Sequence, residues 1–219
     1  MNETLKRALS GAVYVAIMWL GTSYSELSFS ILFGVILLVC LYEMWKLRKG
    51  KSKLIAFLYV LAPLLLIQLF GMTDSDYPES HFDSSLILLM FVLTWTFDTF
   101  AYLLGVRFGK HKILPSVSPK KSWEGFAGGW VFTMLATFLV AQYTELATID
   151  LEGFNPYIFA AILPFTATIG DFTESYFKRQ AGVKDSGNFI PGHGGMLDRM
   201  DAFMITILAL YIYINLIRI

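Results

Sequence analysis

Seven long apolar segments dominate the sequence and restrict the folds that it can adopt. They cover approximately residues 8–22, 27–45, 54–71, 85–105, 125–143, 156–176 and 200–217. Each is close to the ~20 residues that an α-helix needs to cross the hydrocarbon core of a membrane. Only 16% of the residues are charged, whereas soluble domains carry about 25%. The sequence therefore predicts an all-α fold, a polytopic membrane helix bundle of about seven transmembrane helices that forms one domain over residues 1–219.

The first and sixth segments depart most from an uninterrupted apolar span of the length that a membrane helix needs. A basic pair at residues 6–7 precedes the apolar stretch 8–20, which is also the outline of a secretory signal peptide. Because no small-x-small cleavage site follows it, we interpret this stretch as the first membrane helix. The sixth segment has a good helix start at Asn155-Pro156, with Asn as the cap, but we expect Pro164 to interrupt it.

Basic residues gather on one side of the predicted bundle. With the N-terminus in the cytoplasm, 16 of the 17 lysine and arginine residues fall in cytoplasmic segments, and only Arg218 does not. The opposite loops carry acidic residues: Asp74, Asp76, Glu79, Asp83, Glu145, Asp150 and Glu152. This asymmetry predicts a multi-pass protein of the inner (cytoplasmic) membrane with a cytoplasmic N-terminus and an odd number of spans. The net charge of zero gives no indication of a nucleic-acid partner.

The cytoplasmic segment after the fourth span carries the first group of candidate functional residues. Asp98 lies inside that span, where a carboxylate is costly and usually faces a bundle interior or a wet cavity. The following loop mixes Gly, Pro, Ser and Lys, and such a loop can direct N–H and ammonium groups toward phosphate oxygens. Its candidates are Ser118, Lys120, Lys121 and Ser122. Each lysine taken alone is explained as well by a topological role at the lipid headgroups.

A second segment, residues 170–201, combines carboxylates with basic residues and a glycine-rich turn. Its candidates are Asp171, Glu174, Lys178, Arg179, Lys184, His193, Asp198, Arg199 and Asp201, and Asp185 is a fifth carboxylate of the segment. Oxygen ligands beside basic residues suit Mg²⁺ bound to a polyphosphate, and His193, between two glycines, could contact phosphate. Zinc is not expected, because it prefers several His or Cys ligands and the single cysteine, Cys40, lies in an apolar run. A solvated loop with ion pairs would explain the lysines but not acids at or inside helix ends.

Both segments resemble one known family. The stretch from Ser175 to Asp201 resembles the signature of the phosphatidate cytidylyltransferase (CDP-diacylglycerol synthase) family. The matching elements are Ser175, Lys178-Arg179, Lys184-Asp185, Gly187, Pro191, His193-Gly194-Gly195, Asp198-Arg199 and Asp201. The stretch from Asp98 to Gly125 resembles that family's other conserved region. The chain is shorter than the usual bacterial members, whose catalytic half is C-terminal, so we expect N-terminal helices at 8–84 and a catalytic part at 85–219.

The resemblance implies a nucleotidyltransferase that transfers CMP from CTP to phosphatidic acid, giving CDP-diacylglycerol and pyrophosphate. Mg²⁺ is the implied cofactor. The resemblance does not decide whether a second monovalent or divalent cation takes part or whether the protein forms a homodimer. The implied catalytic residues are Asp171, Asp198, Lys178 and Arg199, of which the two aspartates are metal ligands. From their positions in the sequence, we add Asp98, Glu174 and Asp201 as supporting metal ligands. The candidates for binding the phosphates of both substrates are Ser118, Lys120, Lys121, Ser122, Lys178, Arg179, Lys184, His193 and Arg199.

Other functions remain open at this point. CDP-archaeol synthase and a CTP-dependent polyprenol kinase share much of this chemistry and differ in the lipid. A transporter would use Asp98 and Asp171 as coupling sites within the membrane. Transporters place such acids near the midplane and often have inverted repeats. Here the acids lie toward one surface, beside loops suited to phosphate, and the sequence has no visible repeat, so an enzyme is favoured.

Overall fold

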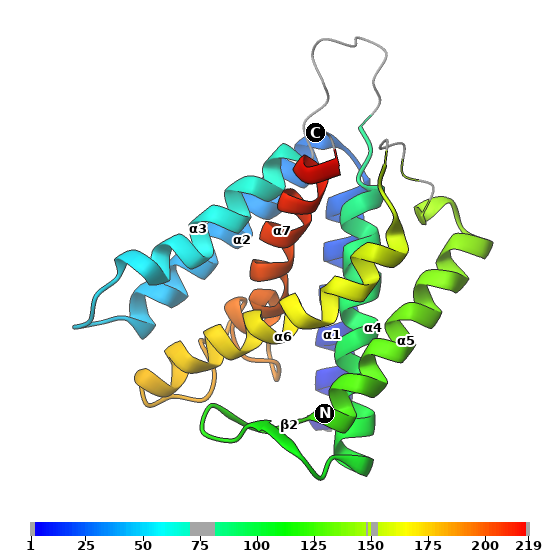
Figure 1. The fold of residues 1–219 in the computed structure, drawn as a ribbon. Helices are drawn as coiled ribbons and strands as arrows, with labels where there is room; N and C mark the ends of the chain where they lie inside the picture. Colours follow the sequence, from blue (N-terminus) through cyan, green and yellow to red (C-terminus); the bar gives the residue numbers. More distant parts are fainter. Residues whose placement is uncertain (1–2, 71–81, 148, 150–152, 218–219) are drawn as a thin grey trace.

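The computed structural model describes residues 3–70, 82–147, 149 and 153–217. Within these ranges the chain forms seven α-helices, a two-stranded hairpin and one short 3₁₀ turn (Figure 1). The helices are α1 Glu3–Ser23, α2 Glu26–Leu47, α3 Leu54–Leu69, α4 Ser85–Phe108, α5 Trp123–Tyr143, α6 Pro156–Gln180 and α7 Leu197–Ile217. The strands are β1 Lys112–Leu114 and β2 Ser118–Ser122, and the 3₁₀ turn is η1 Glu145–Ala147. Each predicted apolar segment is a helix, which confirms the all-α fold class.

Three helices, α2, α4 and α5, are long and apolar enough to cross a membrane. Helix α3 is also apolar but shorter. Helix α6 is not one of the three, and its second half carries the charged residues Asp171, Glu174, Lys178 and Arg179. By length and composition the chain thus has the apolar helices of a membrane protein.

Local sequence signals explain where several helices begin. The Asn155 side chain accepts from the backbone N–H groups of Tyr157 and Ile158, and Pro156 occupies the first turn, as predicted. Ser122 caps α5 by accepting from the Gly125 N–H. The interruption expected at Pro164 is wrong, because α6 is one helix that continues through it. Proline removes a single N–H donor, and that loss can be tolerated where neighbouring helices hold the backbone in place.

Helices α4 and α5 pack almost backbone to backbone. A Cβ atom on Gly125 would lie 2.5 Å from the Ala101 carbonyl oxygen, and one on Gly129 would lie 2.8 Å from the Phe97 ring. Small residues allow such close approach between membrane helices. The core between α2, α4 and α7 is aromatic, with the Phe91 ring centroid 5.1 Å from that of Phe203. This packing fixes the end of α4 relative to the start of α5.

The connection from α4 to α5, expected to be a loop, forms the β1–β2 hairpin. Its strands pair antiparallel, with Lys112 opposite Ser122 and Leu114 opposite Ser118. The Glu124 carboxylate holds the base of the hairpin, because it accepts from the backbone N–H groups of Lys110 and His111. The hairpin therefore extends from the rigid α4–α5 pair across one end of the bundle (Figure 1).

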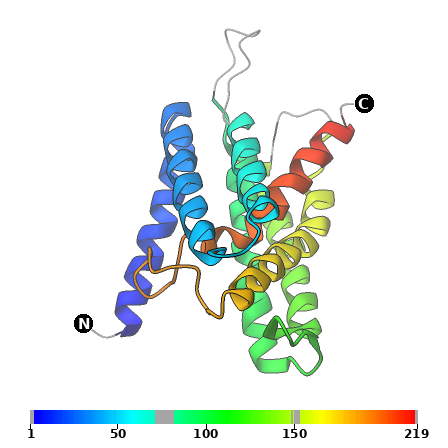
Figure 2. The same ribbon diagram turned by 90° about the vertical axis from the view of Figure 1, so that its left-hand side faces the viewer.

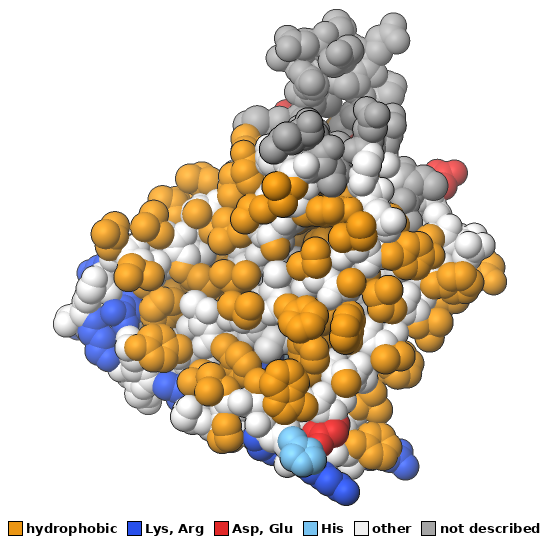
Figure 3. Space-filling view, viewed as in Figure 1, with side chains coloured by type: hydrophobic (Ala, Val, Ile, Leu, Met, Phe, Trp, Pro, Cys, Tyr) orange, Lys and Arg blue, Asp and Glu red, His pale blue; other side chains and the backbone are white. Residues whose placement is uncertain are grey.

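The connections separate into two ends of the bundle. The beginning of α1, the α2–α3 connection, the hairpin and the 181–196 segment lie toward one end, and the end of α7 lies at the other (Figures 1 and 2). In Figure 3, hydrophobic side chains cover the middle of the visible face and Lys and Arg side chains gather along the end with the hairpin. Six of the charged residues on which the predicted orientation depends lie outside the described residues: Asp74, Asp76, Glu79, Asp150, Glu152 and Arg218.

Candidate functional site

A cavity of about 630 Å³ lies between α4, the hairpin, α6 and the start of α7. It is apolar on one side, where Phe97, Ala101 and Phe126 line it, and charged on the other. Eight of the predicted site residues line it: Asp98, Ser118, Lys120, Lys121, Ser122, Asp171, Asp198 and Asp201. The two sequence segments thus converge on one site, although a long stretch of chain separates them.

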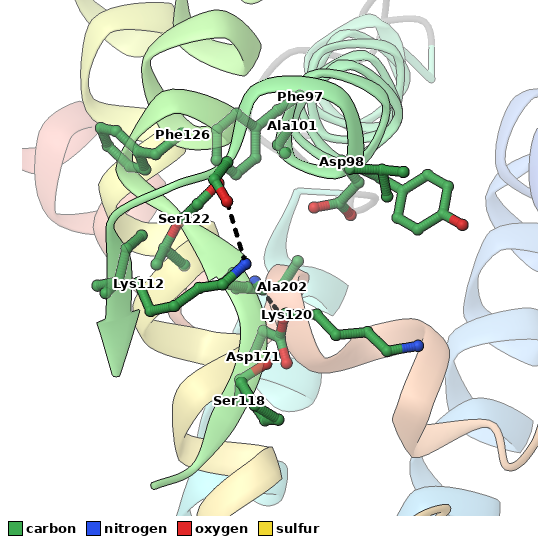
Figure 4. Close-up of a pocket in the computed structure, with 18 of the residues that line it drawn as sticks. Phe97, Asp98, Ala101, Lys112, Ser118, Lys120, Ser122, Phe126, Asp171 and Ala202 are labelled. Carbon is green, nitrogen blue, oxygen red and sulfur yellow. Dashed lines mark hydrogen bonds and ion pairs between the residues drawn. The ribbon is translucent and has the colours of Figure 1, made fainter. Parts of the chain in front are cut away.

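The hairpin forms a cationic wall of this cavity. Lys120 is exposed, and its ammonium group extends into the space between the hairpin and α7 (Figure 4). Lys121 forms an ion pair with Oδ2 of Asp171, across the cavity on α6. Lys112, which is not among the predicted site residues, also lines the cavity and donates to the Gly109 carbonyl oxygen at 3.4 Å. Strand β2 therefore brings Lys121 to a carboxylate of α6.

The facing wall carries Asp171 of α6 and Asp201 of α7, which form an acidic cluster with the buried Glu174 beside the cavity. Asp171, Glu174 and Asp201 each offer an oxygen, and these oxygens lie within 4.8 Å of one another. The two helices come together at Gly170, where a Cβ atom would collide with the Asp201 backbone. The Tyr59 hydroxyl on α3 lies 2.9 Å from the Gly170 carbonyl oxygen and 3.3 Å from that of Asp201, so it can donate to either. Tyr59 thus holds the backbone at the helix crossing that creates the acidic cluster.

The acidic cluster fits a hard divalent cation. Oε1 of the buried Glu174 has no hydrogen-bond partner among the described residues, and Oε2 meets only the ammonium group of Lys178. A buried carboxylate oxygen without a donor is costly, and like charges this close repel each other. A cation among the three carboxylates would remove both costs, and an all-oxygen ligand set suits Mg²⁺.

Asp198 is held differently from the cluster. Its Oδ1 accepts from the Lys178 ammonium at 2.6 Å, and its Oδ2 accepts from the backbone N–H groups of Gly195 and Ser186 at 2.7 and 2.9 Å. Asp198 lies outside the group of three that Asp171 forms with Glu174 and Asp201. Asp198 still lines the cavity, and its role as a metal ligand stays a prediction.

Asp98 reaches the same cavity from the other side. It lies in the second half of α4, and Figure 4 shows its carboxylate directed toward the space in front of α7. Its position at a cavity agrees with the expectation for a carboxylate within a membrane helix.

Six predicted residues do not line the cavity. Lys178 is buried between Glu174 and Asp198 and pairs with both. Arg179 donates to the carbonyl oxygens of Val117 and Val183, so it links the hairpin to the 181–196 segment. Lys184 is exposed on that segment. The remaining three are Glu174, His193 and Arg199.

His193 and Arg199 brace the chain around the glycine-rich turn. Arg199 donates from Nε and Nη2 to the His193 carbonyl oxygen, at 3.1 and 2.6 Å. Nδ1 of His193 shares a 2.9 Å hydrogen bond with the Ser10 hydroxyl on α1. In the described part of the chain these two residues act as supports for the turn, and a phosphate contact for either stays a prediction.

Sequence reasoning missed Glu43 and Ser186. Glu43 is a buried carboxylate on α2, bound to the segment that precedes α7. It lies inside the predicted span 27–45, so it could have been predicted, like Asp98, as a costly carboxylate within a membrane helix. Ser186 had no signal in the sequence, because its role depends on two carboxylates that only the fold brings to it.

Comparison with known families matches residues 54–217 to the model of the cytidylyltransferase family. The matched region runs from the start of α3 to the end of α7, so α1 and α2 lie outside it. It includes the hairpin, the acidic cluster and the whole of the cavity lining.

Several curated relatives are similar to the chain, and each is named phosphatidate cytidylyltransferase. The relative from Thermotoga maritima is 42% identical over 143 residues, which are 63% of this chain and 52% of that protein. The relative from Haemophilus influenzae is 42% identical over 118 residues, 53% of this chain and 41% of that protein. The relative from Mycobacterium bovis is 39% identical over 144 residues, 64% of this chain and 44% of that protein. The chain thus spans about half the length of the curated relatives that it matches.

Proposed function

The chain belongs to the cytidylyltransferase family, and from this premise we propose that it is a phosphatidate cytidylyltransferase. It transfers CMP from CTP to phosphatidic acid and releases pyrophosphate, forming CDP-diacylglycerol for phospholipid synthesis. The observation that carries the proposal is the cavity in which lysines of β2 face carboxylates of α6 and α7. One wall suits the phosphates of a nucleotide and of a lipid, and the other suits the cation that accompanies a triphosphate.

The same proposal includes a membrane topology. All seven helices cross the inner membrane, the N-terminus is cytoplasmic, and the end with the hairpin faces the cytosol. The gathering of Lys and Arg at that end supports this orientation (Figure 3). A site at the membrane surface can receive CTP from the cytosol while the acyl chains of phosphatidate stay in the leaflet.

We place Mg²⁺ at Asp171, Glu174 and Asp201, with Asp98 and Asp198 as further candidates around the cavity. When bound, the cation neutralises triphosphate charge and stabilises the departing pyrophosphate. The protein's own contribution is to position the groups: Ser118 and Lys120 lie on the exposed strand, where they can bind phosphate oxygens. Lys121 already pairs with Asp171, and a bound triphosphate offers it a second anionic partner in the transition state.

The metal proposal has a direct test. Excess EDTA should abolish transfer by the purified enzyme, Mg²⁺ added beyond the chelator should restore it, and Zn²⁺ alone should not, because the cluster offers only carboxylate oxygens. Full turnover in excess EDTA would exclude a required divalent cation.

The position of the radiolabel on CTP tests the function itself. Purified protein in detergent receives phosphatidate, Mg²⁺ and CTP labelled at either the α- or the γ-phosphate. A cytidylyltransferase places only the α-label in the lipid, whereas a lipid kinase places only the γ-label there. Replacing phosphatidate with an archaeal ether lipid or with a polyprenol separates the related enzymes. If no lipid is labelled from either form of CTP, the proposed function is wrong.

A further inference from the structure

Helix α2 lies outside the region matched to the family, yet it buries a carboxylate beside the site. Glu43 is 4% exposed. Its donors in the described part of the chain are two backbone N–H groups and one hydroxyl. Oε1 accepts from the Met196 N–H at 3.1 Å, while Oε2 accepts from the Leu197 N–H at 2.8 Å and from the Ser186 hydroxyl at 2.9 Å.

These contacts make Glu43 a cap for α7, supplied by another helix. Leu197 is the first residue of α7, and the N–H groups of a helix's first turn have no partner within the helix. A carboxylate at a helix N-terminus also interacts favourably with the partial positive charge there. Glu43 therefore determines where α7 begins, one residue before Asp198.

The same carboxylate reaches Asp198 through Ser186. The Ser186 hydroxyl lies 2.9 Å from Oε2 of Glu43 and 3.0 Å from Oδ2 of Asp198, and its single proton can serve one of them at a time. The Ser186 N–H and the Gly195 N–H both donate to Asp198. Glu43 and Asp198 thus both bind Ser186, before the glycine-rich turn, and both bind backbone N–H groups of residues 195–197, after it.

Steric contacts show how closely this segment is shaped around Glu43. A Cβ atom on Gly187 would lie 2.5 Å from Oε1 of Glu43, and one on Gly195 would lie 2.5 Å from Oε2. Both positions belong to the motif that resembles the family signature. The glycines are needed here because the backbone must reach a carboxylate that comes from α2.

From these contacts we propose that Glu43 is a positioning residue for the nucleotidyl transfer. It holds residues 186–197 in the conformation that presents Asp198 to the cavity. The inference rests on the proposed function, and it adds α2 to the elements that the reaction requires. Because Glu43 does not line the cavity, it acts through Asp198 and not on the substrate.

The test replaces Glu43 with Gln, which keeps the size but turns an amide N–H₂ group toward one of its donors. We expect kcat to fall ~10-fold or more, the scale of losing a residue that orients a ligating carboxylate. KM for CTP should stay within about threefold, because no substrate contact is removed. Glu43→Asp, which keeps the charge, should retain more of the wild-type kcat. The matched control is Glu26→Gln, the same change at the other end of α2.

A double variant distinguishes positioning from a general structural role. If Glu43 acts through Asp198, adding Glu43→Gln to Asp198→Asn should lower kcat less than about twofold further, since coupled residues are not additive. If the fold-losses in kcat of the two single variants multiply in the double variant, the inference is wrong. It is also wrong if Glu43→Gln has the kcat of the wild type.

If Glu43→Gln does not purify as a folded protein, Ser186→Ala takes its place. It removes the shared hydroxyl and should also lower kcat at unchanged KM, while a wild-type kcat would overturn the inference. If the wild-type enzyme labels no lipid, the proposed function is wrong. If the wild-type enzyme is active and Glu43→Gln is equally active, only this inference is wrong.

Discussion

At the scale of single residues, Asp171 connects the two walls of the cavity. Its Oδ1 accepts from the Ser175 hydroxyl at 3.1 Å, its Oδ2 pairs with Lys121, and it belongs to the acidic cluster with Glu174 and Asp201. A change of charge at this position therefore affects the lysine on the hairpin and the proposed cation together. No other member of the cluster pairs with a residue of the hairpin within the described parts of the chain.

We predict that Asp171→Asn lowers turnover by at least ~10²-fold, the scale of losing one strong transition-state stabiliser. Asn keeps the size and one oxygen but loses the negative charge. The variant should still purify, because removing a charge within a membrane helix does not weaken apolar packing. Asp198→Asn should have an effect of similar size, measured in the same lipid-labelling assay.

Asp83→Asn is the matched control for both variants. Asp83 precedes α4 at the opposite end of the bundle, where it accepts from the Ser85 N–H, so turnover should stay near that of the wild type. Turnover above about a tenth of wild type in either site variant, against the ~10²-fold loss expected, would show that the residue is not a primary metal ligand.

At the scale of elements, the hairpin is held in place by a few side-chain contacts, of which those of Glu124 lie at its base. Glu124 accepts from the backbone of Lys110 and His111, and its Oε1 also shares a 2.6 Å hydrogen bond with Nδ1 of His111. The two strands are short and bury little, so their position depends on this base, on the pair between Lys121 and Asp171, and on the hydrogen bond from Arg179 to the Val117 carbonyl oxygen. Short hairpins are only marginally stable without further support.

We predict that Glu124→Ala raises KM for CTP ~10-fold, because the lysines of β2 lose their fixed position and ordering them then costs free energy at binding. Limited proteolysis should cut residues 109–118 faster in this variant than in the wild type. Lys110→Gln, which leaves the backbone N–H of that residue in place, is the control. An unchanged KM together with faster proteolysis would mean that the hairpin does not bind CTP.

At the scale of the whole molecule, the arrangement of the connections is the feature that a membrane would use. The basic α2–α3 connection, the hairpin and the 181–196 segment lie at one end, together with the start of α1 (Figure 2). On the face that Figure 3 shows, Lys and Arg side chains gather at this end, as is expected for a membrane protein with one fixed orientation.

Labelling of introduced cysteines tests that orientation. With Cys40 replaced, single cysteines are placed at Ser52, Ser116, Ser80 and Thr148, of which the last two lie outside the described residues. An impermeant thiol reagent should label positions 80 and 148 in intact cells, and positions 52 and 116 only after permeabilisation. Labelling at position 116 in intact cells would place the cavity on the wrong side for cytosolic CTP.

The sequence by itself determined the number and the approximate limits of the helices. Apolar segments of this length are stable in a membrane only as helices, so composition and length predict them directly. It also identified the two segments that line the cavity. A charged side chain inside or beside an apolar span is costly in free energy, so its presence there indicates a functional role. The helix start at Asn155, with its capping side chain, follows from the local sequence alone.

Only the tertiary structure decided which of these residues meet. Helix crossing at Gly170 brings Asp201 to Asp171 and Glu174, whereas Asp198 turns toward Lys178 and the backbone of the glycine-rich turn. The hairpin and the role of Glu43 depend on contacts between segments that are far apart in the chain. Periodicity and spacing report the surroundings of a residue along its own helix, and they carry no information about which other helix packs against it.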